Sequence, residues 1–110
     1  VAQKVDNLTV FVDANKWQAT DRSADLVGPT SLKDKWASFG WNSSEINGND
    51  MKQIQAALAK KPNKYKPTAI ILNTIKGKGV SFMEDDNNWH YRIPNNKEVE
   101  MAFNELGVKL

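Results

Sequence analysis

Residues 68–84 read TAIILNTIKGKGVSFME. The first six residues form a nearly continuous apolar run of strand length, which is typical of a parallel strand covered on both faces. Two lysines and two glycines follow at positions 76–79, and glycines allow backbone N–H groups to approach an anion while lysines add positive charge. This segment therefore predicts a buried strand that leads into a candidate ligand-binding loop.

Two further strands are expected upstream. Residues 8–12 (LTVFV) are apolar and β-branched, and residues 41–46 form a weaker candidate that ends at the turn Asn47-Gly48. Residues 14–30 show no periodicity and are expected to form a loop, and Pro62 and Pro67 bracket a basic loop.

Three helices are predicted from capping residues and apolar periodicity. They begin after Ser31, Asp50 and Asn95, and the last two of these have a glutamine or glutamate three positions later, as in a capping box. Their apolar faces would be formed by Leu32, Trp36 and Phe39, by Met51, Ile54 and Leu58, and by Val99, Ala102, Phe103 and Leu106. We interpret the first of these faces as core rather than as part of a cofactor site.

The alternation of strands and helices predicts the α/β fold class, as three layers in which helices pack on a small parallel sheet. Residues 1–110 are treated as a single domain, because a chain of this length is too short for two. Right-handed crossovers bring the loops that follow the strands to one edge of the sheet, which is where such sheets bind ligands. We therefore expect the loop after residue 12 and the loop after residue 73 to share one site.

Composition bounds the class of protein. A net charge of +2 is too small to indicate nucleic acid or a membrane surface as a partner, and no apolar run approaches the roughly 20 residues of a membrane span. The absence of cysteine excludes disulfides and thiolate metal sites and is consistent with a cytoplasmic protein. The first residue is Val1 rather than Met, which indicates a processed or proteolysed chain or a piece of a longer one.

Three groups of residues could carry chemistry. Asp13 and Asn15 offer oxygen ligands for Mg²⁺ or Ca²⁺, although the same residues are common in strand-terminating turns. The Lys-Gly-Lys-Gly run could hold an anion or form a flexible surface turn. His90, the only histidine, could act as an acid, a base or a phosphate donor, or could simply be a packed or solvated side chain beside Trp89. The acidic residues 84–86 are interpreted as a solvated loop.

Several stretches together resemble the transketolase family. They are Asp6-Asn7-Leu8, Val12-Asp13-Ala14-Asn15-Lys16, Asp34-Lys35-Trp36, Phe39-Gly40-Trp41, Asn47-Gly48, Lys66-Pro67-Thr68, the run from Lys76 to Glu84, and Trp89-His90. The resemblance is to the carboxyl-terminal half of the diphosphate-binding amino-terminal domain, of the type in which the enzyme is split into two chains. By this resemblance residues 1–110 form one partial domain.

The resemblance implies thiamine diphosphate and Mg²⁺ (or Ca²⁺) as cofactors. Asn15 would provide a side-chain ligand to the metal, and Trp17 a backbone carbonyl. His90 would lie near the diphosphate and the reacting substrate and take part in proton transfer. Lys76 and Gly77 would shape the cofactor-binding loop. The sequence departs from many relatives at Thr20-Asp21, Asn49 and Tyr91, which bears on the loop geometry.

The implied activity is transfer of two-carbon ketol units between sugar phosphates, as in the pentose phosphate pathway. The Gly-Asp-Gly segment that opens the family's cofactor motif does not occur in these 110 residues, so the isolated chain is expected to be inactive. Its expected partners are the upstream half of the same domain and a pyrimidine-binding domain or subunit, in a homo- or hetero-oligomer. Two alternatives remain: a non-catalytic α/β fragment or relic with a structural or assembly role, and part of a deoxyxylulose-phosphate synthase.

Overall fold

The computed structural model describes residues 1–60 and 64–109, so the first part of the predicted loop between Pro62 and Pro67 lies outside them. Within this part of the chain, three strands form one parallel sheet: β1 (Thr9–Asp13), β2 (Asn42–Asn47) and β3 (Thr68–Asn73). Their order is β1-β3-β2. All three predicted strands are confirmed to within one residue at each end.

The central position of β3 follows from its composition. Ala69, Ile70 and Ile71 are at most 1% exposed, so this strand is apolar on both faces and needs a neighbour on each side. The sequence of β2 is NSSEIN, which alternates polar and apolar residues only weakly. An edge position tolerates such a strand because one row of its backbone groups faces away from the sheet.

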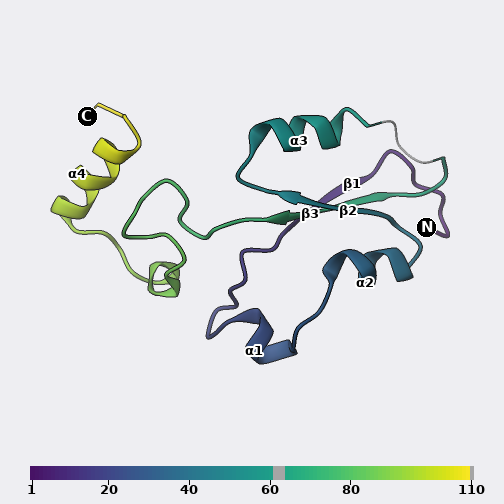
Figure 1. Ribbon diagram of the computed structural model, residues 1–110, viewed down its shortest axis with the longest axis horizontal. Coiled ribbons are helices and arrows are strands. Elements are labelled where there is room, and N and C mark those ends of the chain that lie inside the picture. The colour runs from purple at the N-terminus through teal and green to yellow at the C-terminus, as the bar shows by residue number, and fades with distance from the viewer. Residues whose placement is uncertain (61–63, 110) are drawn as a thin grey trace.

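Helices cover both faces of the sheet. The short helix α1 (Ser23–Val27) and α2 (Leu32–Ser38) lie on one side, and α3 (Met51–Leu58) lies on the other (Figure 1). The connection from β1 to β2 crosses over β3, and the connection from β2 to β3 runs back in the opposite direction. Right-handed crossovers in opposite directions place their helices on opposite faces. The predicted three-layer α/β fold is thus confirmed.

Two local predictions in this region were wrong. Residues 14–30 were expected to be a loop, but α1 forms within them; its five residues are too few to show helical periodicity. Phe39 was expected in the core, but it is 76% exposed. It is the C-cap of α2, so it lies beyond the last helical residue and no longer shares a face with Trp36, which packs edge-on against Trp41 at 4.6 Å between ring centroids.

The predicted N-terminal caps are present, one of them in a different form. Ser31 accepts a hydrogen bond from the Asp34 N–H, and Asn95 forms a reciprocal capping box with Glu98. The Asp50 carboxylate accepts a hydrogen bond from the backbone N–H of Gln53, as expected. The side-chain oxygen of Gln53, Oε1, accepts from the backbone N–H of Asn47 rather than from that of Asp50. Gln53 therefore ties α3 to the end of β2.

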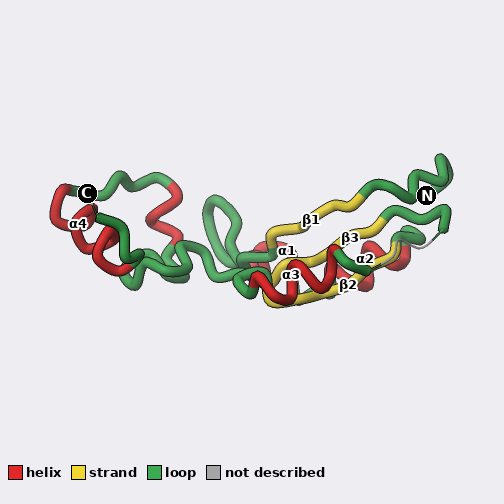
Figure 2. The backbone as a smooth tube through the Cα atoms, turned by 90° about the horizontal axis from the view of Figure 1, so that it is seen from above, coloured by secondary structure: helices red, strands yellow, loops and turns green. Residues whose placement is uncertain are grey.

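The chain after β3 extends away from the sheet. It passes through several turns and the 3₁₀ helix η1 (Asn87–His90), and then forms α4 (Asn96–Glu105). Figure 2 shows α4 at the end of the molecule opposite the N-terminus, and the molecule measures 51 × 33 × 19 Å. His90 is the last residue of η1. Over the ranges 1–60 and 64–109, no helix has the length and apolar character that crossing a membrane requires.

Candidate functional site

Two loops meet beyond the carboxyl ends of the strands, as the sequence predicts. We call residues 14–22, after β1, the first loop, and residues 74–91, after β3, the second loop. Ala14 N donates to Leu72 O at 2.8 Å, which continues the β1–β3 pairing past the strand. The hydroxyl of Thr74 donates to the Asp13 carboxylate. The two loops therefore leave the sheet side by side.

The first loop is built around Asn15. Its Oδ1 accepts a hydrogen bond from the Trp17 N–H at 2.9 Å, and its Nδ2 lies 3.4 Å from the Asp13 carboxylate. Lys16, between Asn15 and Trp17 in the sequence, has a φ of +70°, in the left-handed region. The side chain of Asn15 thus closes a tight turn of the kind that Asn favours.

The Trp17 carbonyl points out of this turn. Trp17 and Arg22 form an antiparallel bridge, in which Gln18 N donates to Asp21 O and Ser23 N donates to Lys16 O. In this arrangement the N–H and C=O of the paired residues point away from each other. The Trp17 N–H reaches Asn15, and the Trp17 carbonyl receives no hydrogen bond from the residues that the structure describes.

These groups are compatible with a hard divalent cation. An amide oxygen has two lone pairs, so Asn15 Oδ1 can bind a cation while it accepts from Trp17 N. The carbonyl of Trp17 is a second oxygen ligand of the type that Mg²⁺ and Ca²⁺ prefer. Residues 1–60 and 64–109 hold no group of three or more His, Cys, Asp or Glu side chains placed to bind a metal ion. The chain itself thus offers part of a coordination sphere.

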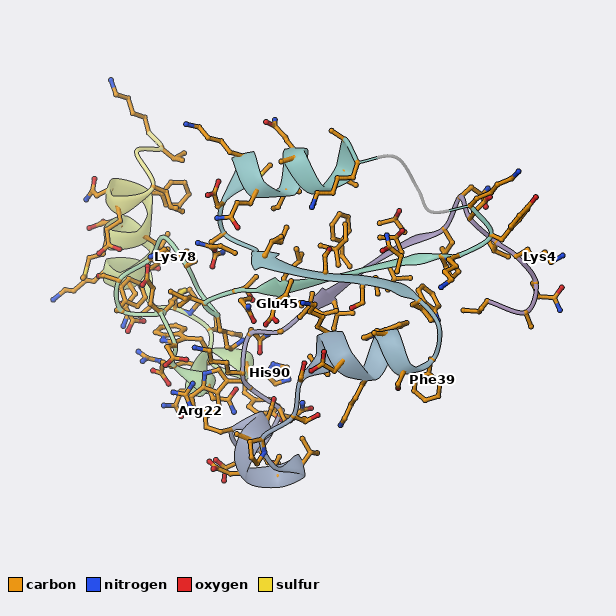
Figure 3. All side chains as sticks on the ribbon, turned by 45° about the vertical axis from the view of Figure 1, so that its right-hand side comes forward. Lys4, Arg22, Phe39, Glu45, Lys78 and His90 are labelled. Atoms are coloured by element: carbon orange, nitrogen blue, oxygen red, sulfur yellow. The ribbon has the colours of Figure 1, made fainter. Side chains whose placement is uncertain are left out.

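A cavity of about 810 Å³ lies beside this turn. Asn15 and Trp17 line it together with residues at the carboxyl ends of the strands, among them Asp13 and Asn73. Glu45 of β2, labelled near the centre of Figure 3, also lines it and accepts a hydrogen bond from Asn73 Nδ2 at 2.8 Å. The cavity extends to the end of α1, the connection to α2 and the start of α2, which contribute Val27, Pro29 and Leu32 in that order.

The Lys-Gly-Lys-Gly run forms a closed turn. Lys78 Nζ lies 3.0 Å from Glu84 Oε1, and the same oxygen accepts from Gly79 N at 3.1 Å. The Gly79 N–H and Lys78 together hold the pKa of Glu84 below its usual value. The turn is therefore closed by its own carboxylate and lies at the surface.

The two predicted residues of this run have different surroundings. Gly77 has φ +72°, and a Cβ on it would lie 2.4 Å from the Met83 carbonyl oxygen, so only glycine fits there. Lys76 is half-buried, and its carbonyl accepts from Asp85 N at 2.9 Å. Neither residue lines the cavity beside Asn15.

The acidic residues 84–86 form a loop at the surface, as expected, and the side chain of Asp85 is 50% exposed. Each carboxylate has hydrogen-bond partners, because the loop folds back on itself and onto the first loop. Asp85 pairs with Arg22 and accepts from the Trp17 indole, and Arg22 lowers the pKa of Asp85 to about 2. Asp86 caps η1 by accepting from Asn88 N at 2.9 Å.

His90 lies at the end of η1 and is exposed to solvent. Its ring packs edge-on against Tyr91 at 4.6 Å, whereas Trp89 turns the other way and donates from Nε1 to Phe82 O at 2.8 Å. This exposure agrees with the alternative in which His90 is a solvated side chain beside Trp89. Figure 3 shows His90 and Arg22 at the same end of the molecule, opposite Lys4.

A second cavity separates the two loops near His90. It has a volume of about 680 Å³ and is lined by Trp17, Ala19 and Thr20 of the first loop and by Asp86, Asn87, Asn88, Tyr91 and Arg92 after β3. His90 lines neither of these two cavities. The structure thus brings the loop that carries His90 to the loop that carries Asn15 and Trp17, with the imidazole itself facing solvent.

Sequence reasoning missed the residues that join the loops. Arg22 and Asp85 belong to stretches that were interpreted as unstructured or solvated, and no local pattern marks them as partners. Asn49 was noted only as a departure from relatives, yet its Oδ1 accepts from Ile75 N at 2.8 Å. Gly48 precedes it, and a Cβ there would lie 2.5 Å from Thr74 Cγ2. The Asn47-Gly48 turn signal located Gly48, but nothing in the sequence indicated that Gly48 and Asn49 contact the second loop.

Comparison with known proteins identifies the family. A family model described as the transketolase thiamine diphosphate-binding domain matches residues 1–110. The chain belongs to this family.

Similar proteins agree with this assignment. The chain is 38% identical to an apulose-4-phosphate transketolase subunit of Actinobacillus succinogenes over 94% of this chain and 37% of that protein. It is 40% identical to the 6-deoxy-6-sulfo-D-fructose transketolase subunit SqwG of a Clostridium species over 74% of this chain and 30% of that protein. The chain thus spans about a third of the length of such transketolase subunits.

The fold is also that of a transketolase. The crystal structure of transketolase from Campylobacter jejuni superposes with a TM-score of 0.87, covering 98% of this chain and 17% of that protein at 24% sequence identity. The α/β assignment and the family resemblance found in the sequence are both confirmed.

Proposed function

We propose that this chain contributes the diphosphate- and metal-binding half-site of a transketolase that transfers two-carbon ketol units between sugar phosphates. Thiamine diphosphate, when bound, supplies the bond-breaking chemistry of such enzymes, and the protein positions it and excludes competing reactions. The observation that carries the proposal is the turn at Asn15, which presents an amide oxygen and the outward carbonyl of Trp17 on the strand-end loop of a transketolase-family domain.

We propose a role for each of the predicted site residues, in line with the family resemblance. Asn15 Oδ1 and the Trp17 carbonyl are proposed ligands of Mg²⁺ or Ca²⁺. His90, on the adjoining loop, is proposed to transfer a proton to or from the substrate and to contact the cofactor diphosphate. Lys76 and Gly77 are proposed to shape the segment between these groups. Gly77 would do so through the close approach to Met83 that a side chain would prevent.

The complete active site requires more polypeptide. The chain offers two oxygen ligands, whereas Mg²⁺ takes six and Ca²⁺ six to eight. We propose that the upstream half of the same domain and a pyrimidine-binding domain or subunit supply the rest. In support, the similar proteins from Actinobacillus succinogenes and Phocaeicola vulgatus are each named as one subunit of an apulose-4-phosphate transketolase.

The test is metal-dependent binding of thiamine diphosphate by the full-length protein, with any partner subunit it requires, measured by titration calorimetry with and without Mg²⁺. Asn15→Ala removes the proposed ligand, whereas Asn15→Asp retains an oxygen for both the metal and the turn. We expect the alanine variant to lose affinity for the cofactor by roughly ten- to a hundredfold and the aspartate variant to lose less. Asn104→Ala, at an exposed position on α4, is the matched control and should bind normally.

Substrate assays separate the alternatives. A transketolase transfers a ketol unit from a ketose donor, whereas a deoxyxylulose-phosphate synthase uses pyruvate. Turnover of a ketose phosphate donor and none of pyruvate would support the proposal. Cofactor binding with pyruvate as the only donor would favour the synthase. A full-length, correctly assembled protein that binds no thiamine diphosphate would be a structural relic.

A further inference from the structure

Arg22 of the first loop and Asp85 of the second loop form a two-point ion pair. The distances are 2.6 Å from Nη1 to Oδ1 and 2.8 Å from Nη2 to Oδ2. The Trp17 indole donates to the same Oδ1 at 2.9 Å, and the Arg22 guanidinium stacks over the Trp17 ring at 3.7 Å from its centroid. We call these three side chains, Trp17, Arg22 and Asp85, the loop clamp.

The loop clamp is poorly placed to stabilise the fold as a whole. The side chains of Arg22 and Asp85 are 34% and 50% exposed, and exposed ion pairs contribute little to the free energy of unfolding. Its geometry serves a different purpose. A planar guanidinium bound through two N–H groups fixes the orientation of the carboxylate as well as its distance, and the stacked indole fixes the guanidinium from one side.

The loop clamp lies between the groups proposed for binding and for proton transfer. On one side, the Trp17 N–H is held by Asn15, so the indole and the proposed metal ligands belong to one turn. On the other side, Asp85 is followed by the cap of η1, the helix that ends at His90. A second contact also joins the two loops, because Asn87 Nδ2 donates to the carbonyls of Gln18 and Ala19 at 3.2 and 3.1 Å.

We propose that Arg22 and Asp85 are positioning residues whose ion pair sets the separation between the Asn15–Trp17 turn and His90. The inference rests on the proposed function, and it adds two residues that act through the geometry of the site rather than by touching the cofactor. The cavity of about 680 Å³ between the two loops is lined from both sides. The shape of this cavity therefore also depends on the loop clamp.

The chain offers clean variants for the test. Asp85 has φ +56°, and asparagine tolerates this left-handed conformation well. Asp85→Asn therefore removes the charge without straining the backbone. Arg22→Gln removes the charge and the two-point geometry, and Arg22→Lys retains only the charge. A double variant of the exposed α4 residues, Lys97→Gln with Glu100→Gln, is the control for loss of two surface charges.

The first experiment does not depend on the cofactor. Amide hydrogen exchange is measured on the full-length protein without ligand. Loss of the ion pair should loosen both loops, so Arg22→Gln should speed exchange at residues 85–90 by roughly tenfold, and Asp85→Asn should do the same at residues 16–19. Lys97→Gln with Glu100→Gln should change neither segment. Exchange that increases only in the loop carrying the substitution would overturn the proposal.

The second experiment tests the consequence for catalysis. In the loaded enzyme, Arg22→Gln and Asp85→Asn should each lower kcat by roughly tenfold, because small displacements of catalytic groups have large effects on rate. The variant that combines Arg22→Gln with Asp85→Asn should have a kcat no lower than that of either single variant, since both substitutions remove the same interaction. Arg22→Lys should not restore kcat. Additive losses, or normal kcat with only a lower melting temperature, would show that the pair is merely structural.

The two experiments separate this inference from the proposed function. If the wild-type protein transfers no ketol unit, the proposed function fails, and the exchange data still decide whether the pair joins the loops. If ketol transfer is present but hydrogen exchange increases only in the loop that carries the substitution, the positioning role of Arg22 and Asp85 is wrong and the proposed function stands.

Discussion

The backbone N–H of Ile75 donates to Asn49 Oδ1 at 2.8 Å, so the turn after β2 holds the start of the loop that follows β3. The two residues are 26 positions apart and lie on neighbouring strand ends. Asn49 is exposed, so it contributes little to the core. Its hydrogen bond instead holds the second loop in place where that loop leaves the sheet.

Removing this contact should have a small effect on stability. Asn49→Ala should lower the free energy of unfolding by about 1 kcal/mol, the usual contribution of one hydrogen bond. Asn49→Asp should retain most of it because the acceptor oxygen remains. Urea unfolding of the full-length protein measures both, and equal losses for the two variants would show that the oxygen is not the important group.

Gly48→Ala should be more harmful than its conservative size suggests. The added Cβ would lie 2.5 Å from Thr74 Cγ2 and 2.6 Å from Leu72 Cβ, so β3 or the loop must shift. We expect a loss of roughly 1–3 kcal/mol, as for other overpacked sites. Thr74→Ser removes the methyl group but keeps the hydroxyl that reaches Asp13, so the double variant should recover part of the loss. No recovery would mean that the contact with Leu72 dominates.

Truncation of one buried and one exposed side chain tests which residues belong to the core. Ile71 is 1% exposed, and Ile71→Ala should lower the free energy of unfolding by roughly 2–4 kcal/mol through lost packing. Phe39 is 76% exposed, and Phe39→Ala should change it by less than about 0.5 kcal/mol. A large loss at Phe39 would indicate that another part of the complete protein covers it.

The attachment of α4 should depend on acid pH. The Glu105 carboxylate accepts from the hydroxyl and the backbone N–H of Ser81, and these bonds hold the pKa of Glu105 below its usual value. A carboxyl whose pKa is lower in the folded protein stabilises the structure above its unfolded pKa and loses this effect as the pH falls towards the folded value. The contact should therefore weaken below about pH 4.3, the usual pKa of glutamate.

Hydrogen exchange at Ser81 measures this effect. Its protection, corrected for the intrinsic dependence of exchange on pH, should fall as the solution is acidified through that range. Glu105→Gln should show low protection at neutral pH and little further change on acidification. A wild-type profile that stays flat from neutral pH down to the acid side of that range would contradict the assignment.

Local patterns predicted much of this fold. The apolar run at 68–73, the strand at 8–12 and the caps at Ser31 and Asn95 depend on neighbouring residues, and each formed where the sequence indicated. The edge of the sheet at which the two loops meet also followed, because all parallel strands point their carboxyl ends the same way.

Contacts between distant segments could not be predicted in this way. Arg22 and Asp85 are 63 positions apart, and both lie in polar stretches that are equally compatible with solvent. The placement of Phe39 depends on where α2 ends, which differs by one residue from where the apolar periodicity ends. The proposed roles of Asn15, Trp17 and His90 come from the family resemblance, because each residue alone has an ordinary structural explanation.

The strand order has a consequence for the synthesis of the chain. β1 pairs only with β3 among the described strands, beginning with Thr9 opposite Thr68, and β2 also pairs with β3. Two of the three strands therefore leave the ribosome before β3, their common partner, has been synthesised, and their backbone groups cannot pair with it until then. A ribosome that stalls within the basic segment before β3 would present β1 and β2 without the strand that joins them, and this is a stage at which the domain exposes unpaired strand edges.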